Sequence, residues 1–192
     1  DETTRAWVES RGYAGGYPTE FSQEKSPNIS ATFAQDATDA KDLFIVNNWG
    51  PDAIDLEAVS ADSNPLSITG VNNPRTFTVE EIRAMPQPEF TAFQNCATNG
   101  EGGALMENIP MKGVPLSYLV EQCGGLVEGT NAMNASGNDG WAAFPPMDMA
   151  LDLMYEDCYV VTQYYGQNLT VDQGAPLVLV PCGMPGAQWV KH

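Results

Sequence analysis

The chain has 192 residues, enough for one domain with a hydrophobic core of its own. Hydrophobic residues make up 43% of it, and no apolar run reaches the roughly 18 residues that a membrane-spanning helix needs, so we expect no membrane insertion. Its 25 acidic and 8 basic side chains give a formal charge of −17, which repels phosphates and argues against nucleic acid as a partner.

Residues 1–42 are rich in Gly, Ser, Thr, Pro and charged residues and show little periodicity. This composition is typical of an extended arm, so we expect the folded domain to cover residues 43–192. Because the sequence shows neither an initial Met nor a signal peptide, we expect it to start after a removed leader or at another boundary.

The first elements of the expected domain follow a strand, strand, helix order. The run LFIV at 43–46 predicts a buried strand, and the alternation in PLSITGV at 65–71 predicts another. In TFTVEEIRAMP, Thr78 is suited to cap a helix and Glu81 stands three residues later, the spacing of a capping box. Pro86 then predicts the end of a short helix.

The segment EFTAFQN at 89–95 predicts a strand that ends just before Cys96, and the glycines that follow allow a tight loop. In GVPLSYLVEQCGG, Pro115 suits the first turn of a helix and Gly124 its end. Cys123 stands four residues after Leu119, on the apolar face of this helix, so we expect it to be buried.

The remaining segments add a possible helix at 145–154 and two strands at 157–169 and 174–181. Strands outnumber helices, the helices are short, and strands and helices do not alternate regularly. The sequence therefore predicts an α+β fold, rich in β-structure. Tyr164, Trp141 and Trp189 are candidates for the wall of a pocket, with core packing as the alternative for each.

Several kinds of catalytic site are excluded by the residues present. The one histidine is His192, so neither a Ser-His-Asp nor a Cys-His arrangement can be assembled with a histidine from the body of the chain. The cysteines contain no CxxC pair, which excludes a zinc ribbon, and the sequence has no GxxxxGK[ST] or GxGxxG loop. A glycosidase-like pair of carboxylates that includes Asp139 would need a separation that the sequence does not give.

Cys96 is the residue whose surroundings suggest chemistry. A thiolate is a soft metal ligand, and small neighbours such as Ala97 and Thr98 leave room for the other groups of a metal centre. A buried free thiol is the alternative that local residues leave open.

Taken in order, six segments of residues 43–192 resemble the molybdopterin-binding domain of the sulfite oxidase family, and the resemblance is closer to its short bacterial members, which lack the following dimerisation domain. These segments are FIVNNWGPDAID, LSITGVNNPRTFTVEEIRAMP, NCATNGEGGAL, KGVPLSYLVEQCGG, DGW and YGQNLTVDQGAPLVLVPCGMPGAQWVKH. The resemblance implies a mixed, β-rich sulfite-oxidase-like fold with short helices and a molybdenum-molybdopterin cofactor.

The resemblance also implies roles for single residues. Cys96 matches the cysteine that ligates molybdenum in the family, and Lys191 matches a lysine near the pterin phosphate. The remaining residues expected to line the cofactor are Asn48, Trp49, Thr98 and Asn99. Trp49 stands where the family usually has a histidine, and Val178 stands where it usually has an arginine, so two groups that would hold anions are missing.

We therefore expect an oxidoreductase domain that carries out two-electron oxygen-atom transfer on a small molecule, with Cys96 as the metal ligand and an external electron-transfer partner. The alternative is a cofactor-free homologue that serves as an extracellular binding or structural module. We further predict a disulfide between Cys158 and Cys182, which would suit an exported protein in the periplasm, at the cell surface or in the medium.

Overall fold

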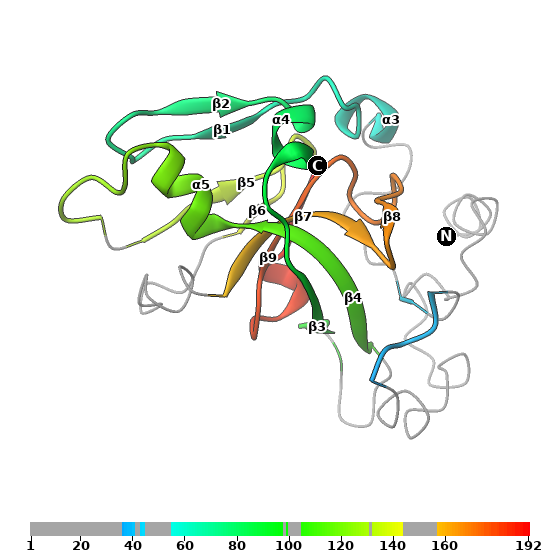
Figure 1. The fold of residues 1–192 in the computed structure, drawn as a ribbon. Helices are drawn as coiled ribbons and strands as arrows, with labels where there is room; N and C mark the ends of the chain where they lie inside the picture. Colours follow the sequence, from blue (N-terminus) through cyan, green and yellow to red (C-terminus); the bar gives the residue numbers. More distant parts are fainter. Residues whose placement is uncertain are drawn as a thin grey trace.

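The computed structural model of the chain describes residues 36–40, 43–44, 55–97, 99, 105–130, 132–143 and 157–192. At its centre lies a six-stranded antiparallel sheet with the strand order β10–β9–β7–β4–β3, in which β8 also pairs with β7 (Figure 1). Within these ranges, no helix combines the length and the apolar character needed to cross a membrane.

The strands of the central sheet differ widely in length, and the longest is β4. They are β3 (Glu89–Asn95), β4 (Met106–Pro115), β7 (Cys158–Tyr164), β8 (Gln167–Asn168), β9 (Val178–Pro181) and β10 (Val190–Lys191). Two small hairpins pair β1 (Leu66–Ile68) with β2 (Arg75–Phe77) and β5 (Ala135–Ser136) with β6 (Ala142–Ala143). The helices are α3 (Leu56–Val59), α4 (Val79–Ala84), α5 (Leu116–Gln122) and the 3₁₀ helix η3 (Gly186–Gln188).

The central sheet is covered on both faces. Val160 and Val161 are neighbours in β7 and therefore point to opposite faces, and each belongs to a different hydrophobic cluster. One cluster contains residues of β2, α4 and α5, which lie on one side of the sheet in Figure 1. The other contains residues of β4 and β9 together with Trp189, and we call it the C-terminal cluster.

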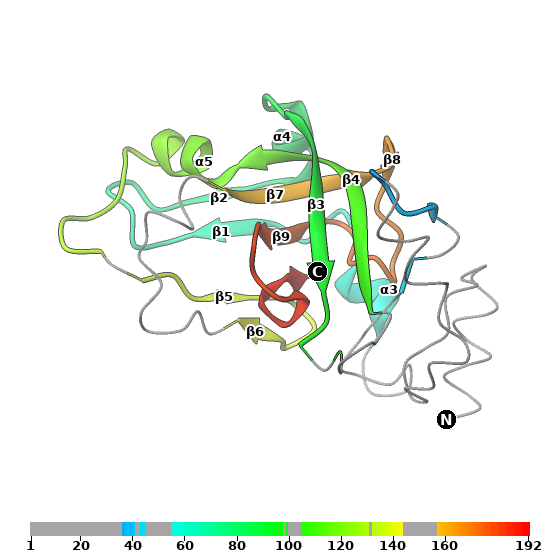
Figure 2. The ribbon, with the colours of Figure 1, turned by 90° about the horizontal axis from the view of Figure 1, so that it is seen from below.

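The C-terminal segment is held against the β5–β6 hairpin. The indole Nε1 of Trp141 donates a hydrogen bond of 3.2 Å to the carbonyl oxygen of Ala187, and the amide of Asn138 donates one of 3.0 Å to the carbonyl of His192. Figure 2 shows the 3₁₀ helix beside this hairpin. The two segments thus form one wall over the C-terminal cluster.

Local sequence signals predicted several elements correctly. The predicted strand at 89–95 is β3, and the helix after Thr78 is α4 with both hydrogen bonds of the capping box, Thr78 N to Glu81 Oε2 at 2.8 Å and Glu81 N to Thr78 Oγ1 at 3.1 Å. Helix α5 begins after Pro115, and Cys123 is buried, which raises the pKa of its thiol. The predicted strand at 43–46 and helix at 145–154 lie largely or wholly outside the described residues, although Leu43 and Phe44 are not in a strand.

Strand β4 was not predicted, although its side chains alternate between buried and half-buried. Pro110 and Gly113 are typical breakers of strands, yet both fit here for local reasons. Pro110 lies ahead of the part of β4 that pairs with β7, which begins at Met111. Gly113 lies at a β-bulge, where the register shifts between Lys112 and Gly113.

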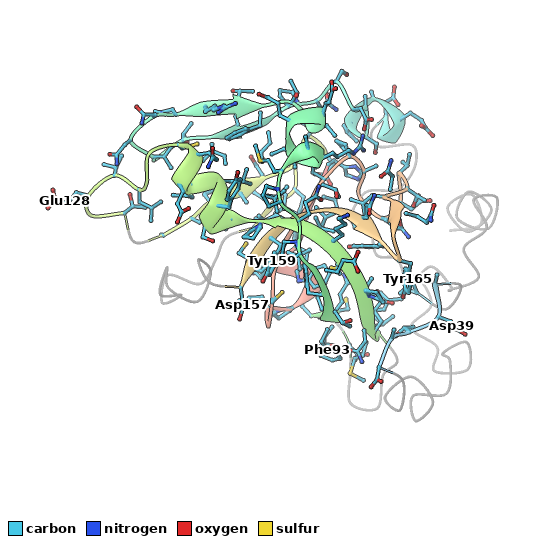
Figure 3. The ribbon with its side chains drawn as sticks, viewed as in Figure 1. Asp39, Phe93, Glu128, Asp157, Tyr159 and Tyr165 are labelled. Atoms are coloured by element: carbon cyan, nitrogen blue, oxygen red, sulfur yellow. The ribbon has the colours of Figure 1, made fainter. Side chains whose placement is uncertain are left out.

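Residues of the predicted arm contact the sheet. Thr38 is buried, its amide donates a hydrogen bond of 2.8 Å to the carbonyl of Asn108, and the hydroxyl of Tyr165 donates to the carbonyl of Thr38. Figure 3 shows Asp39 and Tyr165 close to each other on this side of the molecule. Leu43 is buried in the C-terminal cluster, so this part of the chain packs on β4 and β7.

The predicted disulfide between Cys158 and Cys182 is wrong for this structure, in which both cysteines are free thiols. Cys158 is paired across the ladder with Pro181, so Cys182 is offset by one position from the residue that faces it. Cys182 lies beyond the last residue of β9, so it does not stand directly opposite Cys158, although the two thiols still influence each other electrostatically.

Replacing Gly113 by alanine should lower the free energy of unfolding by about 1–3 kcal/mol, because the new Cβ would lie 2.8 Å from the carbonyl oxygen of Val160. Urea denaturation measures the change. The control Lys112→Ala alters the neighbouring residue without adding an atom and should cost less than about 1 kcal/mol. Equal losses in the two variants would contradict a steric role for the glycine.

Candidate functional site

A cavity of about 260 Å³ lies on the face of the sheet that carries the C-terminal cluster. It is lined by residues from β3, β4, β7, β9 and β10, from η3, and from the turn of the β5–β6 hairpin. Its polar and ionisable lining residues include Cys96, Glu107, Asp139, Tyr164, Asp172 and Lys191. Segments far apart in the sequence therefore bring a thiol, an amine and three carboxyl groups to one space.

Strand β3 positions Cys96, which follows its last residue. The amide of Cys96 donates a hydrogen bond of 3.0 Å to the carbonyl of Leu105, and the carbonyl of Cys96 accepts one of 3.0 Å from the amide of Asn99. On the other side, Gly186 of η3 packs closely on β3, since a Cβ there would lie 3.1 Å from Nε2 of Gln94. Contacts from Leu105, Asn99 and Gly186 thus position the backbone around Cys96.

Asn99 closes the loop that carries Cys96. Its side-chain oxygen accepts a hydrogen bond of 3.1 Å from the amide of Leu105, and its Nδ2 donates one of 3.3 Å to Oδ1 of Asn95. Asn99 is not among the described residues that line the cavity, so it acts here on the loop itself.

Lys191 lies on the last strand, with its ammonium group at the cavity. Its Nζ donates a hydrogen bond of 2.7 Å to the carbonyl of Asp172, and burial lowers the pKa of the ammonium to about 8 against the opposing effect of Asp172, Asp139 and Glu107. Two glycines leave room for the backbone and the aliphatic chain of Lys191. A Cβ at Gly137 would overlap the carbonyl oxygen of Lys191, and one at Gly174 would lie 2.6 Å from its Cγ.

Glu107 is a buried acid of β4 that also lines the cavity, and only 3% of it is exposed. Its Oε2 accepts a hydrogen bond of 2.8 Å from the amide of Phe44. Burial raises the pKa of its carboxyl to about 8, although that hydrogen bond and the charge of Lys191 oppose the shift. Near neutral pH, Glu107 is therefore mainly protonated, whereas Lys191 is mainly charged.

Aromatic and apolar side chains form the rest of the lining. The indole Nε1 groups of Trp141 and Trp189 each donate a hydrogen bond of 3.2 Å to a backbone carbonyl, which satisfies their polar atoms. Both tryptophans and Tyr164 line the cavity, as proposed for them from the sequence, while Trp189 and Tyr164 also belong to the buried core. Val178 lines the cavity as well.

The structure unites only some of the residues predicted for the site. Cys96 and Lys191, which are 95 positions apart in sequence, line the same cavity. Asn48, Trp49 and Thr98 lie outside the described residues.

The comparisons with known proteins now decide the family. The family described as "Oxidoreductase molybdopterin binding domain" matches residues 53–192, which is most of the chain. The chain belongs to this family. The predicted sulfite-oxidase-family domain and its β-rich mixed fold are thereby confirmed.

Relatives of this molybdopterin-binding domain are much longer proteins. It is 26% identical over 175 residues to "Nitrate reductase [NADH] 2" of Phaseolus vulgaris, which covers 78% of this chain and 19% of that protein. With "Nitrate reductase [NADH] 1" of Arabidopsis thaliana it shares 28% identity over 152 residues, covering 66% and 16%. The chain thus spans about a fifth of the length of these curated relatives or less.

A solved structure has a similar fold. The sulfane dehydrogenase SoxCD from Paracoccus pantotrophus matches with a TM-score of 0.60 and 26% identity, covering 68% of this chain and 36% of that one. This match supports the mixed, β-rich fold described above.

The residues around the cavity fit part of what a molybdopterin-binding domain needs. A half-buried thiol at the end of a strand is a suitable ligand for a soft metal, and an ammonium group such as that of Lys191 is able to offset the negative charge of a phosphate. Among the described residues, no group of three or more His, Cys, Asp or Glu side chains is arranged to hold a metal ion.

Sequence reasoning missed Glu107 and Asp172 as cavity residues. Glu107, Ile109 and Met111 occupy alternating buried positions of β4. An acid within such an alternating pattern was the sequence signal that could have identified Glu107. Asp172 lies in a polar turn, where an aspartate is ordinary, and only the fold shows that it is 1% exposed.

Stability should fall as the pH rises through the range in which Glu107 titrates. The unfolded carboxyl loses its proton near pH 4.5, and the folded one near pH 8, so its contribution is complete below about 4.5 and is lost as the pH rises through about 8. Glu107→Gln keeps an acceptor for the amide of Phe44. The loss of free energy of unfolding between pH 5 and 8 should be smaller in this variant by about 1–3 kcal/mol.

Urea denaturation at pH 5, 6, 7 and 8 measures this profile. Glu128→Gln, which removes an exposed acid from a loop at the far end of the molecule in Figure 3, is the matched control and should leave the slope unchanged. A wild-type slope that persists in Glu107→Gln would assign the pH dependence to other groups.

Proposed function

We propose that the cavity beside Cys96 holds a molybdenum-molybdopterin cofactor, that Cys96 is the protein ligand of the metal, and that the domain carries out two-electron oxygen-atom transfer. The observation that supports this most is the meeting of Cys96 and Lys191 in one cavity of a molybdopterin-binding domain. When bound, the cofactor supplies the two-electron redox chemistry.

The protein supplies a fixed thiolate and a cation. Hydrogen bonds from the backbone of Cys96 and across the loop through Asn99 hold the thiol in place, which lowers the cost of ordering a ligand. Lys191 would lie toward the phosphate of the pterin, where a charge-assisted hydrogen bond contributes most. Asn48, Trp49 and Thr98 remain proposed lining residues.

Glu107 is suited to hold a proton at the cavity. Oxygen-atom exchange with water requires protons to enter or leave, and a carboxyl group with a pKa of about 8 can both donate and accept one near neutral pH. We assign this role to its Oε1, since Oε2 accepts the hydrogen bond from Phe44.

Electrons would come from or go to an external partner protein or domain. The two relatives reported above both carry the name nitrate reductase [NADH], and this chain covers 19% and 16% of their lengths. Export of the protein, expected from the sequence, stays a prediction.

A cofactor-free binding module is the second candidate, and two observations favour it. Val178 places an apolar side chain at the cavity where the resemblance expects an arginine, and the carboxyl groups of Asp139 and Asp172 line the same space. Both features weaken the binding of an anionic cofactor.

Protein produced in a host that makes the cofactor should contain close to one molybdenum and one pterin per chain, measured by elemental analysis and by pterin fluorescence after acid oxidation. Cys96→Ala should abolish turnover while retaining at least part of the pterin, because the pterin has contacts beyond the metal. Cys182→Ala removes a half-buried thiol that is not among the cavity lining and should keep both metal and turnover. A folded wild-type protein without molybdenum or pterin would favour the cofactor-free candidate.

A further inference from the structure

Basic side chains are scarce in the part of the chain that forms the domain. Of the eight in the sequence, four lie in residues 1–41, and only Arg75, Arg83, Lys112 and Lys191 lie in residues 42–192. None of the undescribed segments between 45 and 156 contains a Lys or Arg. The cations that the domain itself can offer to a negatively charged substrate are therefore these four.

Three of these four cationic side chains are not among the residues that line the cavity. Arg75 forms an ion pair with Glu81 at 2.9 Å and lies over the ring of Phe77. Arg83 forms an ion pair with Asp62, with its Nη1 at 2.6 Å from the carboxylate.

Lys112 stands opposite Glu89 and Gln163 in the sheet, and it is not among the residues that line the cavity. Lys191 is thus the one cation among the described lining residues. If Lys191 serves the phosphate of the cofactor, the described lining offers no second cation to a substrate.

The other polar residues of the lining favour a positively charged ligand. Asp139 and Asp172 contribute carboxylates, and Glu107 adds a third carboxyl group that is mainly protonated near neutral pH. Trp141 and Trp189 also line the cavity, and their indole N–H groups donate to backbone carbonyls. Carboxylates attract ammonium groups and repel oxyanions, and the face of an aromatic ring attracts cations.

We propose that the substrate of this cavity carries no negative charge, and that a small organic cation or an uncharged organic molecule is accepted in preference to an oxyanion such as nitrate or sulfite. This inference rests on the proposed function for its reaction, although the charge preference belongs to the cavity itself. It also separates this chain from the relatives named as nitrate reductases, whose named substrate is an anion.

Cys96 itself can report the charge preference. The chain is produced in a host that cannot make the cofactor, and its fold is checked by near-ultraviolet circular dichroism. Its thiols are then modified in about 0.15 M salt, because surface charges more than roughly 8 Å away are screened at this ionic strength. Two methanethiosulfonate reagents are compared, one bearing a trimethylammonium group and one a sulfonate group. In both, the thiolate attacks the sulfenyl sulfur and methanesulfinate leaves.

Peptide mass spectrometry gives the rate at each cysteine, and each rate is divided by the rate with 2-mercaptoethanol. The cation-to-anion ratio at Cys96 should be about tenfold or more and should exceed the ratio at Cys182, which lies outside the cavity lining and is influenced there by one acid, Asp157. Asp139→Asn keeps the acceptor for the amide of Trp141 and should lower the Cys96 ratio about threefold. The control Glu128→Gln removes the same charge at the distant loop and should change it little.

A ratio at Cys96 at or below one would overturn the proposal, and so would a ratio no larger than that at Cys182. A high ratio that Asp139→Asn leaves unchanged would also overturn it, because the cavity carboxylates would not be its source. These results are independent of the metal analysis. A chain without molybdenum would refute the proposed oxidoreductase function and leave the charge preference of the cavity standing.

Discussion

The hydrogen bond from Nζ of Lys191 to the carbonyl of Asp172 connects strand β10 with the turn that precedes β9. The aliphatic chain of Lys191 lies against Gly174, and the backbone of Lys191 lies against Gly137. A side chain at either glycine would collide with Lys191. The same segment carries η3, which packs against the end of β3 next to Cys96. The segment that carries Lys191 thus also forms the wall of the cavity beside Cys96.

The electrostatics of this cavity follow from that arrangement. Burial lowers the pKa of Lys191 and raises that of Glu107, so both values approach about 8 from opposite directions. Paired shifts of this kind bring the pKa values of a proton donor and of a cation close to physiological pH, and they are common at functional sites. Among the described lining residues, Lys191 is the one cation, while Asp139 and Asp172 contribute carboxylates, so the balance of charge is negative. The family resemblance implies a further arginine at the position of Val178.

The sequence allowed β3, α4 and α5 to be predicted because their signals are local. An alternating run, a capping box and a proline before an apolar face act within a few residues. Strand β4 could not be predicted in this way, since Pro110 and Gly113 are tolerated only because the pairing of β4 with β7 starts at Met111 and because Gly113 lies at the bulge. The meeting of Glu107, Asp172 and Lys191 depends on long-range pairing of strands. Cys96 was selected by its small neighbours and by family resemblance, and Lys191 by family resemblance alone. Their convergence on one cavity depends on the tertiary fold.

The direct test of Cys96 as a metal ligand is X-ray absorption at the molybdenum edge of the purified protein and its Cys96→Ser variant. The serine keeps the size of the side chain and the backbone of the loop while replacing sulfur by oxygen. We expect the variant spectrum to lose one sulfur neighbour of molybdenum and to gain one oxygen or nitrogen neighbour, with the pterin content retained. An unchanged number of sulfur neighbours in the variant would contradict the assignment of Cys96 as the ligand.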